Sequence, residues 1–309
     1  MRVFVAGGTG AIGRRLLPRL VEAGHQVAAT TRFRSKAEQL RSFGATPCVL
    51  DALDPPSVSR AVLGFRPDVV MNQLTSLPAD YDLRKLGPWF ERTAQLRVAG
   101  TKSLIAAAQA TGSARFVYQS IAFMYAPVGP RVVDEDAPLM LRAAGPFGAA
   151  VRATVEGERL AMTADGMTGV VLRYGQLYGP GTHFDTGAYF SRQARRRLLP
   201  VVGCGTGIMS LVHVDDAAAA SVCALERGNG IYNIVDDEPV LSRDFIPAFC
   251  AASGSPTPVH IPGWLGRLLG GPLVPYFEEL RGASNARAKR ELAWAPSHRT
   301  WRNDFNVRT

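Results

Sequence analysis

The sequence predicts an α/β protein with a doubly wound parallel sheet and a smaller, discontinuous C-terminal lobe. Through the first 178 residues, short apolar runs rich in β-branched residues alternate with Ala-, Leu- and Arg-rich stretches. This alternation is typical of βαβ units, whose parallel strands are buried on both faces. Beyond residue 178 the connections become rich in Gly and Pro, and a strand-like run returns near residue 230. We therefore expect the chain to leave the sheet, rejoin it once and leave again.

Seven strands and five crossover helices account for the pattern in order. Strands are predicted where Val, Ile, Phe, Tyr or Thr cluster, at residues 2–7, 25–32, 46–52, 68–74, 115–120, 168–174 and 230–237. Helix-forming stretches between them predict helices at residues 11–24, 35–44, 55–65, 89–112 and 145–160. Pro146 stands near the first turn of the last helix, where proline is tolerated. We expect one domain from residues 1–178 and 207–237, and a lobe from residues 179–206 and 238–309.

Composition and charge exclude several classes of protein. With 47% hydrophobic and 20% charged residues among 309, the chain is typical of a globular protein with a substantial core. Its apolar runs are strand-sized, so no membrane span is predicted. The net charge of +9 is dense only at residues 195–197 and lacks interleaved aromatics, so we expect no nucleic-acid partner. The four cysteines lack metal-binding spacing and no signal peptide precedes the first strand, so we expect no metal and a cytoplasmic location.

Three glycines follow the first predicted strand and open the first predicted helix. In VFVAGGTGAIG they are Gly7, Gly10 and Gly13. Glycine there permits a tight turn and a close approach of backbone amides to a pyrophosphate, which the positive N-terminal end of the helix attracts. A structural turn would also use glycine, but the strand before and the helix after favour a dinucleotide site. The expected pyrophosphate-binding residues are Gly7, Thr9, Gly10, Ala11, Ile12 and Gly13.

The end of the second predicted strand indicates which dinucleotide binds. A carboxylate there would bind the ribose 2′-hydroxyl of NAD and repel a 2′-phosphate. The stretch VAATTRFRSK has no acid and instead carries Arg32, Arg34 and Lys36 after two threonines. We therefore predict NADPH or NADP+, with Arg32 and Arg34 on the 2′-phosphate, although these cations could also be a solvated helix start. Asp51 with Ala52 is expected to contact the adenine, or Asp51 is an ordinary helix cap.

The motifs GGTGAIG, VLDALD, RFVYQS, VVLRYGQLYGPGT and SLVHVDDAA occur in this order. With them the chain resembles, nearly end to end, the extended short-chain dehydrogenase/reductase family, also called the NAD-dependent epimerase/dehydratase family. The resemblance implies a Rossmann-like fold and a nicotinamide ring flanked by Tyr174, Gly175, Gln176 and Leu177. From their places after the fourth and fifth strands, we expect Gln73 and Leu74 near the adenosine ribose or phosphates, and Gln119 and Ser120 near the nicotinamide ribose.

The resemblance fails at the residues that carry the family's chemistry. The family pattern implies a Ser or Thr after the strand RFVYQS, then a Tyr and a Lys one turn apart at the start of the next long helix. In that scheme the Tyr transfers the proton and the Lys lowers the pKa of the Tyr. Here the three positions hold Ile121, Phe147 and Val151, and shifting the alignment by one or two residues restores no such pair.

Three explanations remain open. The substrate itself could protonate the developing alkoxide through a neighbouring hydroxyl, with hydride transfer depending mainly on proximity. Another side chain could act, with Ser120 as the leading candidate because it ends a strand beside the expected nicotinamide. Chemistry could also be lost, leaving an NADP(H)-binding regulatory protein, while an epimerase or dehydratase is disfavoured because it needs the same missing pair. The other candidate acids are Tyr118, Tyr125, Tyr174, Tyr178, His183 and His213.

With Ile, Phe and Val in these positions, the chain resembles the atypical ketoreductases of aromatic polyketide antibiotic pathways. That resemblance implies NADPH-dependent reduction of an angucyclinone-type polycyclic ketone to a secondary alcohol, aided by the substrate's own hydroxyls. The expected partner is thus a small aromatic ketone. The apolar segment PGWLGRLLGGPLVPYF could be a lid that presents Trp264, Leu265 and Leu268 to it, or plain lobe core. The sequence leaves open the identity of the ketone, the direction of reaction, and the choice between monomer and homodimer.

Overall fold

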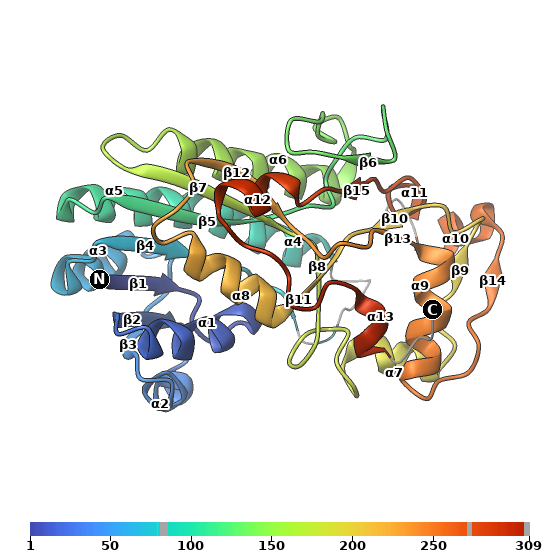
Figure 1. Ribbon diagram of the computed structural model, residues 1–309, viewed down its shortest axis with the longest axis horizontal. Helices are drawn as coiled ribbons and strands as arrows, with labels where there is room; N and C mark the ends of the chain where they lie inside the picture. The colour runs from blue at the N-terminus through green and yellow to red at the C-terminus, as the bar shows by residue number, and fades with distance from the viewer. Residues whose placement is uncertain (79, 81–85, 271–273, 306–309) are drawn as a thin grey trace.

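The computed structural model describes residues 1–78, 80, 86–270 and 274–305. Its centre is a seven-stranded sheet in which every neighbouring pair is parallel (Figure 1). In spatial order the strands are β12 (Gly230–Ile234), β7 (Thr168–Tyr174), β5 (Arg115–Ile121), β4 (Val69–Asn72), β1 (Arg2–Ala6), β2 (Gln26–Thr31) and β3 (Thr46–Val49). All seven predicted strands are present, and the predicted doubly wound architecture is confirmed.

Helices cover both faces of the sheet because alternate side chains of each strand point to opposite sides. Val3 and Val5 of β1 share one core with α1 (Ala11–Glu22) and α8 (Val214–Cys223). Phe4 and Ala6 share the other core with α3 (Pro55–Phe65), α5 (Thr101–Thr111) and α6 (Gly145–Met162). The short α2 (Ala37–Ser42), preceded by the 3₁₀ turn η1 (Arg34–Lys36), packs beside β3.

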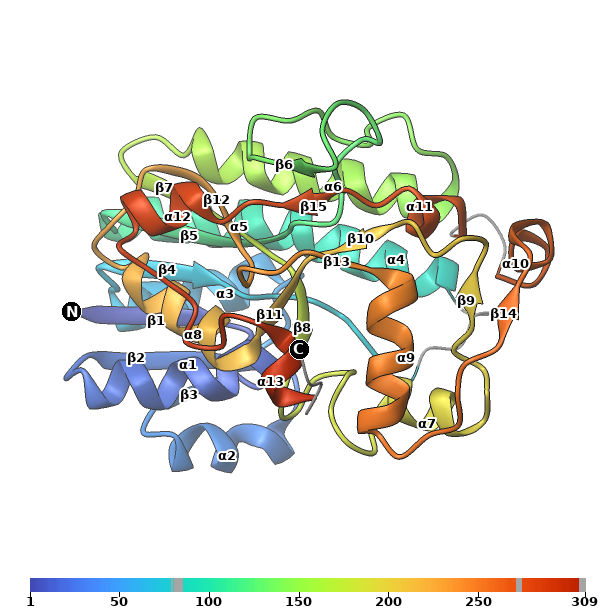
Figure 2. The same ribbon diagram turned by 45° about the vertical axis from the view of Figure 1, so that its right-hand side comes forward.

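A smaller lobe lies beyond the carboxyl ends of the strands (Figure 2). Its core is aromatic, with Phe245 and Phe249 of α9 packed around Trp301 of α13. The lobe's other elements are short: α7 (Tyr189–Arg195), β9 (Val201–Val202), β10 (Ile208–Met209), β13 (Val240–Leu241), α9 (Ser242–Ala252), β14 (His260–Ile261), α10 (Gly263–Gly270), α11 (Val274–Glu278) and α13 (Trp301–Asp304). The ladder of β8 (Gln176–Tyr178) with β11 (Leu211–His213) joins the two parts.

The C-terminal segment departs from the boundary expected at residues 238–309. The strand β15 (Gly282–Ala283) pairs with β6 (Val132–Val133), and α12 (Ala286–Glu291) packs on β12. Leu292 and Trp294 then enter the core of the sheet domain. This stretch belongs by packing to the sheet domain, because its apolar side chains cover the edge strand β12, and only α13 returns to the lobe.

A local irregularity interrupts the long helix expected at residues 89–112. It consists of α4 (Leu86–Gln95), one π-helical turn at Leu96–Gly100 and α5. Such a turn inserts an extra residue and redirects the side chains around it, and it is frequent at functional sites. No helix among the described residues is long and apolar enough to cross a membrane.

Candidate active site

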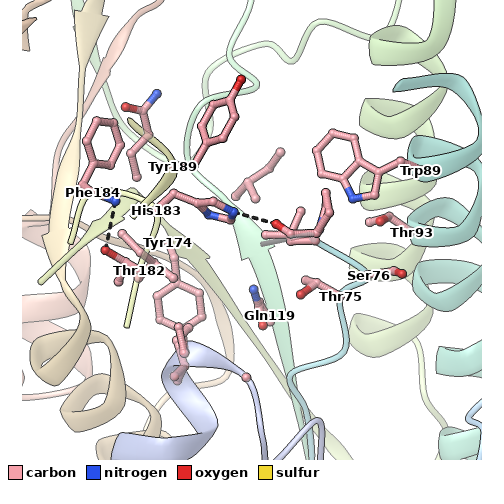
Figure 3. Close-up of a pocket in the computed structure, with 18 of the residues that line it drawn as sticks. Thr75, Ser76, Trp89, Thr93, Gln119, Tyr174, Thr182, His183, Phe184 and Tyr189 are labelled. Atoms are coloured by element: carbon pink, nitrogen blue, oxygen red, sulfur yellow. Dashed lines mark hydrogen bonds between the residues drawn. The ribbon is translucent and has the colours of Figure 1, made fainter. Parts of the chain in front are cut away.

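A pocket of about 1300 Å³ runs along the carboxyl ends of the strands and into the lobe. It begins at the glycine loop after β1, passes the ends of β4 and β5, and reaches the aromatic side chains of α4 and of the 182–190 segment. Figure 3 shows its middle, with Gln119 at the end of β5, Trp89 and Thr93 on α4, and His183 and Tyr189 opposite. The position matches the crevice in which open α/β sheets bind ligands.

The glycine loop forms a cradle that side chains could not share. Gly7 has a φ of +95°, and a Cβ there would lie 2.6 Å from the carbonyl oxygen of Gln73. A Cβ on Gly13 would lie 2.5 Å from the carbonyl oxygen of Gly8, so only glycine lets α1 approach the loop. The loop opens onto the N-terminus of α1, where backbone amides attract an anion. The predicted residues Gly7, Thr9, Gly10, Ala11, Ile12 and Gly13 all line the pocket here.

At the adenosine end, the pocket is lined by cations and no acid. Arg32 and Lys36 line it together with the ring of Phe33, which lies 5.5 Å from the Arg32 guanidinium carbon and 5.3 Å from Lys36 Nζ. The acids among the described lining residues are Asp80, Asp185 and Glu278, which all occur after residue 76. Lys36 lines this end beside the predicted Arg32, although Lys36 was not among the predicted site residues.

Two residues predicted for this end lie apart from the pocket wall. Arg34 lines a separate shallow pocket with Glu38 and Arg41. Asp51 accepts hydrogen bonds from the Leu53 N–H at 3.0 Å and from Arg92 Nη2 at 2.8 Å. Burial by itself would raise the pKa of the Asp51 carboxyl. The hydrogen bonds from Leu53 and Arg92, with the charge of Arg92, lower it by a larger amount, so the pKa of Asp51 lies below its ordinary value. Of the two residues predicted to contact the adenine, only Ala52 lines the pocket.

Amides line the middle of the pocket, where the nicotinamide half of a dinucleotide is predicted to lie. Gln73 is 5% exposed and its Nε2 reaches the Tyr174 hydroxyl at 3.5 Å. The Oε1 atoms of Gln73 and Gln176 are buried and have no hydrogen-bond partner among the described residues. Buried acceptors without partners indicate a missing donor such as a carboxamide or a ribose hydroxyl. The other predicted residues that line this part are Leu74, Gln119, Tyr174, Gly175 and Leu177.

The three apolar replacements also line the pocket. Val151 is fully buried and packs against Met124 and Met140. The Phe147 ring lies 4.8 Å from the ring of Tyr276 in α11, and Ile121 packs in the same cluster. The first turns of α6 therefore present a hydrocarbon surface to the cleft. None of these three side chains can donate a proton.

The hydroxyl of Ser120, the leading candidate acid, is already engaged in a buried hydrogen bond. Ser120 has no exposed surface, and its Oγ donates to Glu158 Oε1 at 2.5 Å. Glu158 in turn is paired with Arg173, with Nη2 2.7 Å from Oε2, and both side chains are almost fully buried. A hydroxyl proton engaged by a carboxylate is unavailable to a ligand in the pocket, so the geometry argues against the catalytic role predicted for Ser120.

Most other candidate acids are also committed to internal contacts. Tyr118, Tyr125 and Tyr178 are buried and absent from the described lining residues. Tyr174 lines the pocket, but its hydroxyl shares a hydrogen bond with Ser221 Oγ at 2.7 Å, and burial raises the pKa of Tyr174 to about 12. A tyrosine with that pKa is a poor acid at neutral pH.

The two histidines differ in position. His213 is buried and its Nδ1 accepts a hydrogen bond from the Asp215 N–H, outside the described pocket lining. Burial lowers the pKa of His213. His183 lies in the pocket, where its Nε2 is 2.8 Å from the Pro78 carbonyl oxygen (Figure 3). Because a carbonyl can only accept, this nitrogen carries the proton and donates it.

The far part of the pocket is aromatic, which the sequence analysis did not predict. Its side chains come from the helices α4, α7, α9 and α11 and from two loops, which lie far apart in the sequence. The lining aromatics are Trp89, Phe90, Phe123, Phe184, Tyr189, Phe190, Phe245 and Phe277. A wall of this kind suits a flat, conjugated small molecule.

The expected lid residues lie elsewhere. Trp264 and Leu268 of α10 are 69% and 74% exposed, and neither they nor Leu265 are among the described residues that line the pocket. Trp264 and Leu268 therefore form neither the lid nor the lobe core expected from the sequence, while Leu265 is half-buried outside the described pocket lining. The neighbouring α11 contributes Val274 and Phe277 instead. The part of the segment at residues 271–273 lies outside the described residues.

Comparisons with known proteins agree with this geometry. The chain is 43% identical over 307 residues to a 3-diazoavenalumate denitrifying reductase of Streptomyces sp, with 98% of each chain covered. It is 31% identical over 269 residues to a 2-alkyl-3-oxoalkanoate reductase of Stenotrophomonas maltophilia, covering 83% of this chain and 77% of that one. A solved UDP-glucose 4-epimerase of Thermus thermophilus in complex with NAD has the same fold, with a TM-score of 0.74, 24% identity and full coverage of both chains.

A family model sets the wider relationship. The model of the NAD dependent epimerase/dehydratase family matches residues 3–235, which run from the first strand of the sheet to the end of its last. The two relatives just described, at 43% and 31% identity, are both named as reductases. The chain therefore belongs to the NAD dependent epimerase/dehydratase family and is an oxidoreductase.

Proposed function

We propose that this oxidoreductase is an NADPH-dependent reductase that acts on an aromatic small molecule without drawing a proton from its own side chains. The observation that carries the proposal is a dinucleotide cleft built by glycine and amide groups beside an acid/base site replaced by Ile121, Phe147 and Val151. A protein that had lost all chemistry would have no need of the deep aromatic part of the same pocket.

NADPH rather than NADH is proposed from the adenosine end. Arg32 and Lys36 offer two cations where an NAD-binding protein of this fold uses a carboxylate. The glycine loop would hold the pyrophosphate, and Gln73, Gln119 and Gln176 the nicotinamide half. When bound there, NADPH would supply a hydride at the boundary between the amide-lined and aromatic parts of the pocket.

One candidate substrate is a ketone of an aromatic polyketide, of the angucyclinone type. Its oxygen must gain a proton as the carbonyl becomes a secondary alcohol, and the hydrocarbon surface of α6 provides none. A phenol next to the carbonyl would hydrogen-bond the developing alkoxide and deliver that proton. The oxo acid in the name of the relative from Stenotrophomonas maltophilia supports a carbonyl substrate.

A second candidate, an aromatic diazo compound, is the one we favour. Hydride addition to the carbon that bears the diazonium group forms a C–H bond as the C–N bond breaks, and the electron pair of that bond leaves with N₂. The balance needs no proton, so it explains the loss of the Tyr and Lys without help from the substrate. The name of the Streptomyces relative, a denitrifying reductase of a diazo compound, supports this class.

Turnover of three substrates with NADPH deuterated at C4 would separate the candidates. The substrates are a hydroxyaryl diazonium salt labelled with ¹⁵N, a polycyclic ketone with a neighbouring phenol, and the O-methyl ether of that ketone. We expect ¹⁵N₂ release with deuterium in the new aryl C–H bond. Turnover of the phenolic ketone alone would instead establish the ketoreductase, and tight NADPH binding without any turnover would refute both.

Restoring the missing phenol should have a selective effect. Phe147 is half-buried beside the cleft, so Phe147→Tyr places a hydroxyl where the family pattern has its acid. We expect turnover of the diazonium salt to change by less than about 3-fold, because that reaction uses no proton, while reduction of the O-methylated ketone rises at least about 10-fold. Val151→Lys can be added, although this position is fully buried. Activity that appears only in the double variant would mean that the natural protein is a binder.

A further inference from the structure

Arg97 is a buried cation without a carboxylate partner among the residues that the structure describes. It lies in the π-helical turn Leu96–Gly100, is 6% exposed, and lines the pocket. Its Nη1 donates to the Tyr118 hydroxyl at 3.3 Å and to the Gln119 carbonyl at 3.2 Å. Within the described chain, Nε and Nη2 have no hydrogen-bond partner and no carboxylate lies within 4.0 Å of the guanidinium. A buried charge in this state is costly unless a ligand completes its contacts.

The place of Arg97 along its helix locates that ligand. Gly100, three residues on, lies beside Ala52 and Leu74, since a Cβ there would be 3.8 Å and 3.7 Å from their atoms. Thr93, four residues earlier, lies beside Trp89 at the right of Figure 3. With a rise of 1.5 Å per residue, Arg97 stands between the adenosine end and the aromatic end. Arg97 lies next to Gln119 at the end of β5, because it donates a hydrogen bond to the Gln119 carbonyl.

The close approach of α6 brings Arg97 to the wall that lacks a lysine. A Cβ added at Gly157 would lie 2.8 Å from the Arg97 carbonyl oxygen and 2.1 Å from the Tyr118 hydroxyl, so the two helices touch through glycine. The Tyr118 hydroxyl, which Arg97 binds, also donates to the Thr154 carbonyl of α6 at 3.5 Å, and Val151 lies one turn earlier on this helix; both Val151 and Thr154 line the pocket. The pocket wall therefore has a hydrocarbon side chain at Val151 on α6 and a guanidinium at Arg97 on the neighbouring helix.

We propose that Arg97 binds the ribose of the nicotinamide half of the cofactor. Arg97 would supply the positive charge that the family pattern places on α6, where this chain has Val151. Nε and Nη2 would donate to the ribose hydroxyls, while Nη1 remains fixed to Gln119 and Tyr118. The π-helical turn places the Arg97 side chain at this point of the pocket wall. The proposal rests on the proposed NADPH site and adds to it a contact that places the nicotinamide ring.

Three ligands of increasing length test the contact on the protein without substrate. They are 2′-phospho-ADP, 2′-phospho-ADP-ribose and NADPH, with dissociation constants measured by calorimetry, and the first two differ only by the ribose. In the natural protein the added ribose should raise affinity. In Arg97→Gln we expect the two ligands that carry the terminal ribose to bind about 10- to 100-fold more weakly, since charged hydrogen bonds are lost, while the affinity for 2′-phospho-ADP stays within about 2-fold. Arg97→Lys, which keeps the charge, should retain most of the gain.

Tyr118→Phe is the matched control, because it removes a structural hydrogen bond of Arg97 and leaves the cation. It should keep the affinity gain from the ribose within about 3-fold. Equal losses for all three ligands in Arg97→Gln, or a full ribose gain retained there, would overturn the proposal. If Arg97→Gln does not fold, Arg97→Met replaces it: loss of the ribose gain there, with the gain normal in Tyr118→Phe, supports the proposal, and a full ribose gain there overturns it. If the natural protein binds none of the ligands, the cofactor proposal itself fails.

Discussion

Replacing Glu158 with alanine is expected to lower the free energy of unfolding by about 3–5 kcal/mol. The change leaves Arg173 charged, 3% exposed and without its carboxylate partner. Burial lowers the pKa of Arg173, but the bond to Glu158 raises it more, so the guanidinium stays protonated when folded. Ser120 also loses the acceptor of its hydroxyl. Urea unfolding followed by circular dichroism measures the loss as a shift in the midpoint at constant slope.

A surface pair on the same helix provides the comparison. Glu156 pairs with Arg159 one turn along α6, with both side chains substantially exposed. Glu156→Ala should therefore cost less than about 1 kcal/mol. Equal effects of the two substitutions would show that water reaches the Glu158 pair and that the buried network is not what binds α6 to β5 and β7.

This network shows why the fold could be predicted and the direction of Ser120 could not. The strands and helices follow from patterns of period 2 and 3.6 and from the glycines at residues 7, 10 and 13, which are local features of the sequence. Ser120 lines the pocket, but whether its hydroxyl is free or bound to Glu158 depends on a residue 38 positions later. Sequence spacing carries no information about such a pair until the sheet and α6 are assembled.

The same limit applies to Arg97 and to the aromatic wall. Arg97 stands in a stretch with ordinary helical periodicity, and only the π-helical turn and the glycine contact with α6 turn it into a buried, pocket-lining cation. Aromatic lining residues such as Phe184 and Tyr189 come from a loop and from the first residue of the short helix α7, and no periodicity in the sequence indicates that they share a wall. A useful signal was nonetheless present, because the loss of both Tyr and Lys at Phe147 and Val151 indicates that a different group must serve the cofactor.

Arg32→Ala is expected to weaken NADPH binding by about 2 kcal/mol, roughly 30-fold, and to leave NADH binding nearly unchanged. Arg32 lines the adenosine end and is exposed in the absence of ligand, so its removal costs little stability. Only NADPH carries the 2′-phosphate that a cation there can bind. Adding Lys36→Ala should enlarge the NADPH loss further, because both cations line this end. Dissociation constants for both cofactors, measured by fluorescence at two salt concentrations, give the ratio directly.

Two neighbouring arginines sharpen the interpretation of that ratio. Arg41 is exposed and paired with Glu38 at 2.8 Å, so Arg41→Ala should change neither cofactor's affinity and reports any general effect of lost surface charge. Arg34, predicted from the sequence to share the phosphate, lines a different pocket, so Arg34→Ala measures how far side-chain motion can bring it across. A loss for Arg34→Ala as large as that for Arg32→Ala would restore the two-arginine site. Equal losses of NADPH and NADH in Arg32→Ala would refute the choice of NADPH, because a contact made only to the 2′-phosphate cannot weaken a cofactor that lacks it.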